Sequence, residues 1–318
     1  MTESIRNKLL LTLRRRLPSK RSSPASSGAV VLCYHHVGSS FPEFTDQLGI
    51  TTPLEELYSD LVFLRRHFKV VSLEHLASSP HREELVALTF DDGYKSVLRE
   101  ALPLLEEFQI PVALYVNYGA VKGRITWLNK LNALLRSLSE SQLSILYERA
   151  LGEKLSAGSA RKVQPYIKKF LFPCTINAIE TSYAEHFSAP PPPDLFMSEA
   201  DIMLAKDHPL ITWGSHSFNH YPLHRLPHET ISEELREGHS ALSSLLEERL
   251  QGCALPFGSA ILRQHNEVVQ AVSSIDQYFI SCTGEQNPGL HIGDLREIRR
   301  FPGPQGMSFL RRRLQGHL

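Results

Sequence analysis

The chain has 318 residues, of which 42% are hydrophobic and 21% charged, so it can bury a sizeable core and wholesale disorder is excluded. Its 34 Lys and Arg residues equal its 34 Asp and Glu residues, which argues against a nucleic-acid-binding protein that works by bulk charge. No apolar run approaches the roughly 20 residues of a membrane span, and the four cysteines lack the C-x-x-C spacing of a zinc site or redox motif.

Residues 1–28 are predicted to be a flexible, basic leader. Seven Lys and Arg residues precede residue 22, against the single acid Glu3. The apolar run Leu9–Leu13 is shorter than the roughly 7–15 residues of a signal peptide, so we expect no export signal and a cytoplasmic protein. The alternative is a basic amphipathic segment that contacts an anionic membrane surface.

From residue 29 onward, short β-rich runs alternate with helical stretches. Strands are predicted at 29–34, 70–73, 85–90, 111–116, 210–213, 253–255 and 278–281, the last two being the final strands. A helix is predicted to open at Thr52–Glu55, a second to run toward Phe108, and a third to be capped at Thr230. This alternation predicts an α/β fold with a parallel sheet and outer helices, either an open sheet or a barrel.

The alternation stops over residues 122–197, which resemble helices without intervening strands. The block ends at the stiff proline run Pro190–Pro193. We expect it to be a helical insertion into the 29–318 frame. It would either cover the active site as a lid or wall, or pack peripherally, and the helix expected over Trp127–Leu138 needs a surface to pack on.

Two carboxylates follow the strand at 85–90, in the segment Thr89-Phe90-Asp91-Asp92-Gly93. Barrels and open α/β sheets place their active sites at the carboxyl ends of strands. Adjacent carboxylates there are favoured when a cation neutralises one of them, and the pair can divide the work, one binding a metal and the other handling protons. The alternative is an ordinary strand-end turn, for which Asp-Gly is a common choice.

Two histidines follow the strand at 210–213, in the segment His216-Ser217-Phe218-Asn219-His220. Histidines four residues apart share one face of a helical turn, so we expect a single turn that presents both imidazoles to one ion. In a chain with 15 histidines this spacing also arises by chance. Together with the aspartate pair, however, it predicts a metal site of Asp92, His216 and His220 with an open position for water.

These segments, together with Tyr34-His35-His36-Val37 and Pro256-Phe257-Gly258, resemble the polysaccharide deacetylases of carbohydrate esterase family four. The resemblance covers roughly residues 29–121 and 198–303. It implies a distorted (β/α) barrel of about seven parallel strands with a divalent metal, commonly zinc. It further implies that Asp91 is the catalytic base, that Asp92, His216 and His220 bind the metal, and that the Phe257 backbone N–H holds the oxyanion.

The chain departs from the family pattern at two points. Many members carry an arginine that orients the base where this chain has Ala254, and we propose that Arg300 supplies the missing guanidinium. The family's C-terminal Leu-x-His, whose imidazole acts as general acid, has no match. His35, His36 and His291 are the candidates for that role. The sequence leaves the general acid unassigned among them, and His35 is included with the candidate catalytic residues.

The predicted function is a metal-dependent carbohydrate N-deacetylase, a hydrolase that removes N-acetyl groups from amino sugars such as N-acetylglucosamine in a polysaccharide, oligosaccharide or lipid-linked glycan. The partner is therefore an N-acetylated glycan and not a nucleic acid. Alternatives are a catalytically impaired glycan-binding homologue, a deacylase of a small non-polymeric amide, and an iron oxygenase with a facial triad. The triad is disfavoured because the aspartate precedes the histidines by over a hundred residues.

Overall fold

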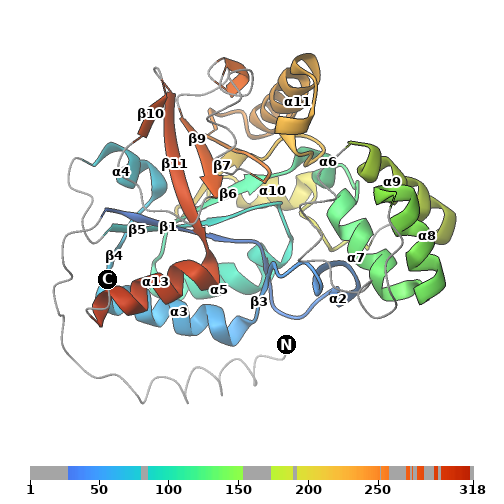
Figure 1. The fold of residues 1–318 in the computed structure, drawn as a ribbon. Coiled ribbons are helices and arrows are strands. Elements are labelled where there is room, and N and C mark those ends of the chain that lie inside the picture. Colours follow the sequence, from blue (N-terminus) through green and yellow to red (C-terminus); the bar gives the residue numbers. More distant parts are fainter. Residues whose placement is uncertain are drawn as a thin grey trace.

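The computed structural model describes residues 28–79, 85–152, 173–188, 192–250, 252–257, 270–272, 274, 278–282, 290–292 and 295–315 (Figure 1). The predicted leader, apart from Gly28, lies outside these residues. Within the described part of the chain, no helix combines the length and the apolar character needed to cross a lipid bilayer.

The centre of the molecule is a closed barrel of parallel strands, as the sequence predicts. Each strand pairs with the next around the ring, and the circle closes because β1 pairs with both β5 and β11. In ring order the strands are β1 (Val30–Tyr34), β11 (Leu295–Pro302), β9 (Tyr278–Cys282), β8 (Cys253–Ala254), β7 (Ile211–Ser215), β6 (Val112–Val116) and β5 (Leu85–Phe90).

Four short strands lie outside this ring. β4 (Lys69–Val70) pairs in parallel with the start of β5, and β10 (Leu290–Ile292) pairs antiparallel with β11. β2 (His36–Val37) and β3 (Thr51–Thr52) form a separate two-stranded sheet next to the carboxyl end of β1.

Helices cover the outside of the barrel (Figure 1). In α3, the apolar residues Leu57, Leu61 and Leu64 recur at helical spacing and are fully buried, which fixes the face that packs inward. The described helical elements around the barrel are α2 (Pro42–Thr45), α3 (Leu54–His67), α4 (Leu73–Ser78), the π-helical turn η1 (Val97–Ala101), α5 (Leu102–Phe108), α6 (Tyr118–Val121), α10 (Glu199–Ala205), the 3-10 turn η2 (Leu223–Arg225), α11 (His228–Leu246) and α13 (Gly303–Leu314).

The strand residues alternate between the helix layer and the barrel interior. One set packs with the helices, as Leu32, Leu88 and Leu114 do. The other set forms an apolar cluster in the interior with Leu73, Leu76 and Ala77 of α4; its strand residues are Ala29, Val31, Leu85, Ala87, Ala113, Tyr115, Ala254, Ile280 and Ile298. Farther along the same strands, toward their carboxyl ends, the alternating residues become polar.

Three helices between β6 and α10 form a second hydrophobic cluster beside the barrel: α7 (Trp127–Ser137), α8 (Glu140–Leu151) and α9 (Pro173–His186). Two buried asparagines of α7 attach them to α2. Asn129 Nδ2 donates to the Phe44 carbonyl, and Asn132 Nδ2 donates to the Glu43 carbonyl at 2.7 Å. These hydrogen bonds fix the α7–α9 helices against the barrel.

Several sequence predictions of secondary structure are wrong. Thr52 lies in β3 and does not cap a helix, because α3 begins at Leu54 after Pro53. The strand predicted at 70–73 ends at Val70, because the Ser72 side chain caps α4 by accepting from the His75 N–H. α11 begins at His228, two residues before the predicted cap at Thr230. Two further strands, β10 and β11, follow the predicted last one. β11 escaped prediction because half of its eight residues are charged, which hides the apolar alternation.

Candidate metal centre and active site

Asp92 lies in a turn directly after β5, where its φ of 69° is rare for a residue with a side chain. This backbone turns its buried carboxylate toward two imidazoles. Asp92 Oδ1 lies 3.3 Å from His216 Nε2 and 3.1 Å from His220 Nε2. The three predicted metal ligands therefore converge, with their ligand atoms within 4.8 Å of one another.

His216 follows β7 and is oriented by a hydrogen bond on its far side. Its Nδ1 lies 2.8 Å from the Ala254 carbonyl oxygen of β8, which can only accept, so Nδ1 carries a proton. In the neutral imidazole, Nε2 is then a bare lone pair directed at Asp92. A backbone carbonyl bonded to the outer nitrogen is the usual support of a metal-binding histidine.

His220 reaches the same point without a helix. Residues 216–221, here called the histidine loop, contain no helical turn, and both Ser217 and His220 have a φ of 59°. The predicted helical turn is therefore wrong, although its two imidazoles do converge. The loop is held by the hydrogen bond from the His220 N–H to Ser217 Oγ and by the bond from the Trp127 indole N–H to the His220 carbonyl at 3.0 Å.

Two glycines that sequence reasoning missed hold the histidine loop between them. A Cβ at Gly119 of α6 would lie 2.4 Å from the Phe218 carbonyl oxygen, and a Cβ at Gly238 of α11 would lie 2.6 Å from the Ser217 carbonyl. Both distances are below van der Waals contact, so only glycine allows α6 and α11 to approach so closely. A glycine inside an otherwise good helix, as at 238, is the one sequence signal for this contact.

The charges of this cluster attract one another, and its hydrogen bonding leaves one acceptor that a cation would satisfy. Burial would raise the pKa of Asp92, but the two histidines, His220 first, outweigh burial and lower it. Burial would lower the pKa of His216, but Asp91 and then Asp92 outweigh burial and raise it. Asp92 Oδ1 has no hydrogen-bond donor. An aspartate and two histidines around such an atom fit a divalent ion such as zinc, which takes nitrogen and oxygen ligands.

Asp91 stands beside this cluster in a bidentate ion pair with Arg300 of β11. The Arg300 Nη1 and Nη2 atoms donate to the two carboxylate oxygens at 2.6 and 2.7 Å, and Arg300 is only 1% exposed. Burial alone would raise the pKa of Asp91, but Arg300 and His216 outweigh it and lower the pKa. Arg300 of β11 thus brings a guanidinium to Asp91, the contact expected of it from the sequence.

The structure separates the three histidines considered as general acid. His35 follows β1. Burial lowers its pKa, and the nearby charges of Asp92 and Asp91, which would raise the pKa, offset this only in part. With Cys33 and Asp91 it forms a group whose polar atoms lie within 4.8 Å of one another. Both ring nitrogens of His36 are instead engaged by hydroxyl groups, Nδ1 by Thr51 and Nε2 by Ser40, each at 3.2 Å. The His291 side chain lies outside the described residues.

Phe257 follows β8 with a φ of 54°, and its ring packs against His220, one of the candidate metal ligands. The ring centroids are 5.1 Å from His220 and 5.6 Å from Trp127. Phe257 therefore lies at the edge of the site, where the family resemblance places it. Trp127, which the sequence suggested only as a helix-packing residue, thus contacts the site through both the His220 carbonyl and this ring.

One segment of the chain matches a known protein family. Residues 78–145, which include β5 and both aspartates, match the family model described as polysaccharide deacetylase. Comparison with curated protein sequences found no match.

Solved structures extend the likeness to most of the chain. The Streptococcus pyogenes deacetylase PplD in complex with acetate has a TM-score of 0.54 at 15% identity, over 91% of this chain and 98% of that chain. IcaB from Ammonifex degensii has a TM-score of 0.53 at 17% identity, over 92% and 99%. The de-N-acetylase from Aggregatibacter actinomycetemcomitans has a TM-score of 0.55 at 13% identity, over 90% and 100%.

At these identities the solved structures establish the fold. The chain is a (β/α)-barrel protein with the fold of the polysaccharide deacetylases. The resemblance to that family, first suggested by the four sequence segments, is confirmed.

Proposed function

We propose that the protein is a metal-dependent hydrolase that removes N-acetyl groups from amino sugars of a glycan. The observation that carries this proposal is the convergence of Asp92, His216 and His220 beside a second carboxylate, Asp91, that contacts an arginine. The polysaccharide deacetylase segment and fold favour acetamide hydrolysis over the other reactions that such a metal site supports.

Asp92, His216 and His220 would hold the ion, with zinc as the expected metal. When bound, a divalent ion supplies Lewis acidity and lowers the pKa of a coordinated water from about 15.7 toward ~7. We assign the proton transfer from the attacking water to Asp91. Arg300 keeps this carboxylate ionised before the reaction and fixes both of its oxygens by the bidentate contact.

We assign delivery of a proton to the departing amine to His35, because it is the histidine close to both aspartates that the ligand set does not use. Its lowered pKa leaves the ring neutral at rest near pH 7, so we propose that it takes up the proton that Asp91 removes from the attacking water and then delivers it to the amine. The Phe257 N–H is proposed to hold the oxyanion, and loss of such a donor costs about 10²–10³ in rate. The C–N bond of the acetamide breaks, and acetate and a free amino sugar are released.

The test is acetate release from a panel of N-acetylated oligosaccharides, small N-acetyl sugars and lipid-linked glycans, measured with and without a chelator. We expect release that a chelator abolishes and that added zinc restores. Binding of the oligosaccharides without any acetate release would contradict the proposal and favour the impaired, glycan-binding alternative. Release from the small N-acetyl sugars alone would favour the deacylase of small amides.

A further inference from the structure

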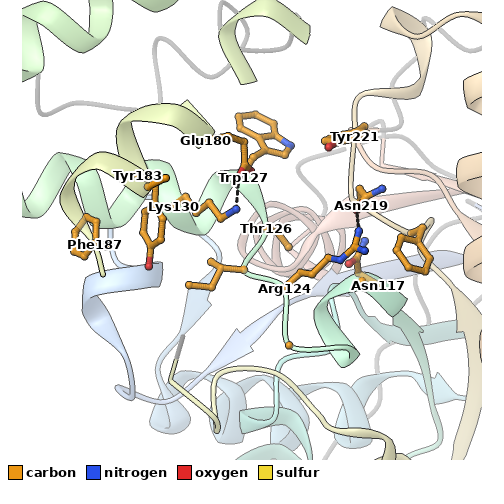
Figure 2. A pocket seen from close by; sticks show the side chains of 15 residues that line it. Asn117, Arg124, Thr126, Trp127, Lys130, Glu180, Tyr183, Phe187, Asn219 and Tyr221 are labelled. Atoms are coloured by element: carbon orange, nitrogen blue, oxygen red, sulfur yellow. Dashed lines mark hydrogen bonds and ion pairs between the residues drawn. The ribbon is translucent and has the colours of Figure 1, made fainter. Parts of the chain in front are cut away.

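A cavity of about 510 Å³ lies beside the metal centre, between the α7–α9 helices and the histidine loop (Figure 2). Its wall includes Asn219 and Tyr221, the two sequence neighbours of His220, and Trp127, whose indole N–H binds the His220 carbonyl. The three metal ligands are not part of the wall. The cavity is therefore a second compartment that shares the histidine loop with the metal centre.

The wall of this cavity has the composition of a site for a sugar ring. Aromatic side chains form much of it and alternate with amide and hydroxyl groups, and its volume falls within the roughly 300–1,000 Å³ of small-ligand sites. Aromatic faces suit the C–H faces of a sugar, and the polar groups suit its hydroxyls. The aromatic residues in the wall are Trp127, Tyr183, Phe187, Phe218 and Tyr221.

The charges in the wall do not cancel. Lys130 is neutralised by an ion pair with Glu180, which Figure 2 shows on the α7–α9 side. Arg124, on the opposite side, donates to Asn219 Oδ1 at 3.0 Å and lies over the Phe218 ring at 5.1 Å. Over the described ranges, no carboxylate forms an ion pair with Arg124. The described wall therefore carries one net positive charge, on the exposed side chain of Arg124.

The position of Arg124 is linked to the histidine loop through Asn219. The Asn219 side-chain amide donates to Glu234 Oε1, and its backbone N–H donates to Glu234 Oε2 at 2.8 Å. With its nitrogen engaged by Glu234, the amide turns Oδ1 toward Arg124. Arg124 thus contacts Asn219, the residue directly before His220 in the histidine loop, and a group bound to Arg124 would lie next to that loop.

We propose that this cavity binds an anionic group of the substrate, a carboxylate or a phosphate carried on the glycan near the acetylated sugar, with Arg124 as its cation. The inference rests on the proposed function and assigns a substrate class to it: acidic rather than neutral glycans. A planar guanidinium next to an amide and aromatic faces matches a carboxylate or phosphate on a sugar ring.

The experiment measures binding by calorimetry in the Asp91→Asn chain, so that substrate is not consumed. Three probes are compared: a neutral tetramer of N-acetylglucosamine, a tetramer in which uronate alternates with N-acetylglucosamine, and the neutral tetramer carrying one phosphate monoester. Each is titrated into the chain with Arg124 intact, with Arg124→Gln and with Lys122→Gln. Lys122 is the matched control, because it is an exposed cation nearby that pairs with Glu199 and lies outside the cavity wall.

We expect at least one acidic tetramer to bind about tenfold more tightly than the neutral one, and Arg124→Gln to remove that preference while Lys122→Gln keeps it. The uronate and phosphate arms identify which anion is preferred. Equal affinity for all three tetramers, no saturable binding of either acidic one, or a preference that survives Arg124→Gln would overturn the inference.

Acetate release is then measured on the same three tetramers with the unsubstituted Asp91. Arg124-dependent binding without acetate release from any of them would support the anion site and contradict the proposed hydrolase. Acetate release without an Arg124-dependent binding preference would support the proposed hydrolase and contradict the anion site.

Discussion

Asp91, at the carboxyl end of β5, and Asp60, on α3 in the outer layer, are both only 3% exposed and both face an arginine. Asp91 accepts two hydrogen bonds from Arg300, which is itself buried. Asp60 accepts one bond at 3.2 Å from Arg311, whose side chain is 48% exposed, and one from the Tyr34 hydroxyl.

The two carboxyl groups respond in opposite ways. Burial raises the pKa of Asp60 to about 6, and the contacts to Tyr34 and Arg311 offset it only in part. At Asp91, Arg300 and His216 outweigh burial, and the pKa is lowered. A desolvated guanidinium in bidentate contact thus holds a buried carboxylate in its charged form, whereas a half-exposed one does not. The following predictions test this difference and the site around Asp91.

The largest expected effect comes from removing a ligand. His216→Ala should lose the bound metal and with it essentially all acetate release, because only two protein ligands, Asp92 and His220, would remain for the ion. Metal content by elemental analysis and turnover are measured together. His75→Gln, at an exposed histidine on α4, is the control and should keep both. Full metal loading of His216→Ala would contradict the ligand assignment.

Removing the charge of the base should be nearly as severe. Asp91→Asn keeps the shape of the side chain but cannot accept a proton, and we expect turnover to fall by about 10³ or more while metal content stays unchanged. Asp60→Asn, at a buried aspartate of the outer helix layer, should leave turnover unchanged. A fall in metal content of Asp91→Asn would instead make Asp91 a ligand.

The arginine comparison should give an intermediate effect. Arg300→Met removes both contacts to Asp91, and we expect turnover to fall by about 10²-fold, with some loss of stability because a buried carboxylate loses its partner. Arg300→Lys should keep part of the activity. An ammonium group restores the positive charge, but it lacks the two parallel N–H donors of a guanidinium and so restores only one contact. Arg311→Met is the matched control and should leave turnover intact. Equal turnover in Arg300→Met and Arg311→Met would exclude a positioning role for Arg300.

Substitution of a glycine beside the histidine loop should have a smaller effect, and the sign of the change in thermal stability tests the close contact. Gly→Ala in a helix interior ordinarily stabilises by about 1 kcal/mol. At Gly238 the new methyl group would press on the Ser217 carbonyl, so we expect lower thermal stability and roughly tenfold weaker metal binding, measured by chelator competition. Ser240→Ala, an exposed position on the same helix, should change neither. An increase in stability of Gly238→Ala would show that the loop can move.

The smallest effect concerns pH and stability at Asp60. Because its pKa is raised to about 6 from 3.8, the folded chain binds more protons than the unfolded chain between these values, and this contribution to stability is lost as pH rises through about 6. Asp60→Asn does not titrate. Its Tm relative to the parent chain should therefore be a few degrees more favourable at pH 8 than at pH 4. A Tm difference independent of pH would contradict the raised pKa.

The sequence predicts the barrel and places the candidate metal-binding residues at its strand ends, because both follow from short-range patterns. Strand runs such as 85–90 are apolar on both faces, and the Asp-Asp and His-x-x-x-His segments lie directly after their strands. Arg300 was also anticipated, but only through the family resemblance, since it reaches Asp91 across the sheet from 209 residues away.

What the sequence could not predict depends on backbone conformations and contacts that leave no local pattern. Ser217 and His220 adopt left-handed backbone angles, so the spacing that indicates a helical turn is met by an irregular loop. The glycine contacts at 119 and 238, and the cavity against α7 and α9, arise from segments that meet only in three dimensions.

The closure of the barrel has a consequence for how activity first appears as the chain folds. β1 and β11 pair with Leu32 opposite Phe301, so the ring is sealed by segments separated by most of the chain length. Contacts of such large sequence separation form slowly, because a long loop must be ordered first. Since Arg300 lies beside that seam, a nascent or C-terminally shortened chain would lack the guanidinium even with every ligand present. Full activity of the proposed hydrolase would therefore require this long-range pairing to have formed.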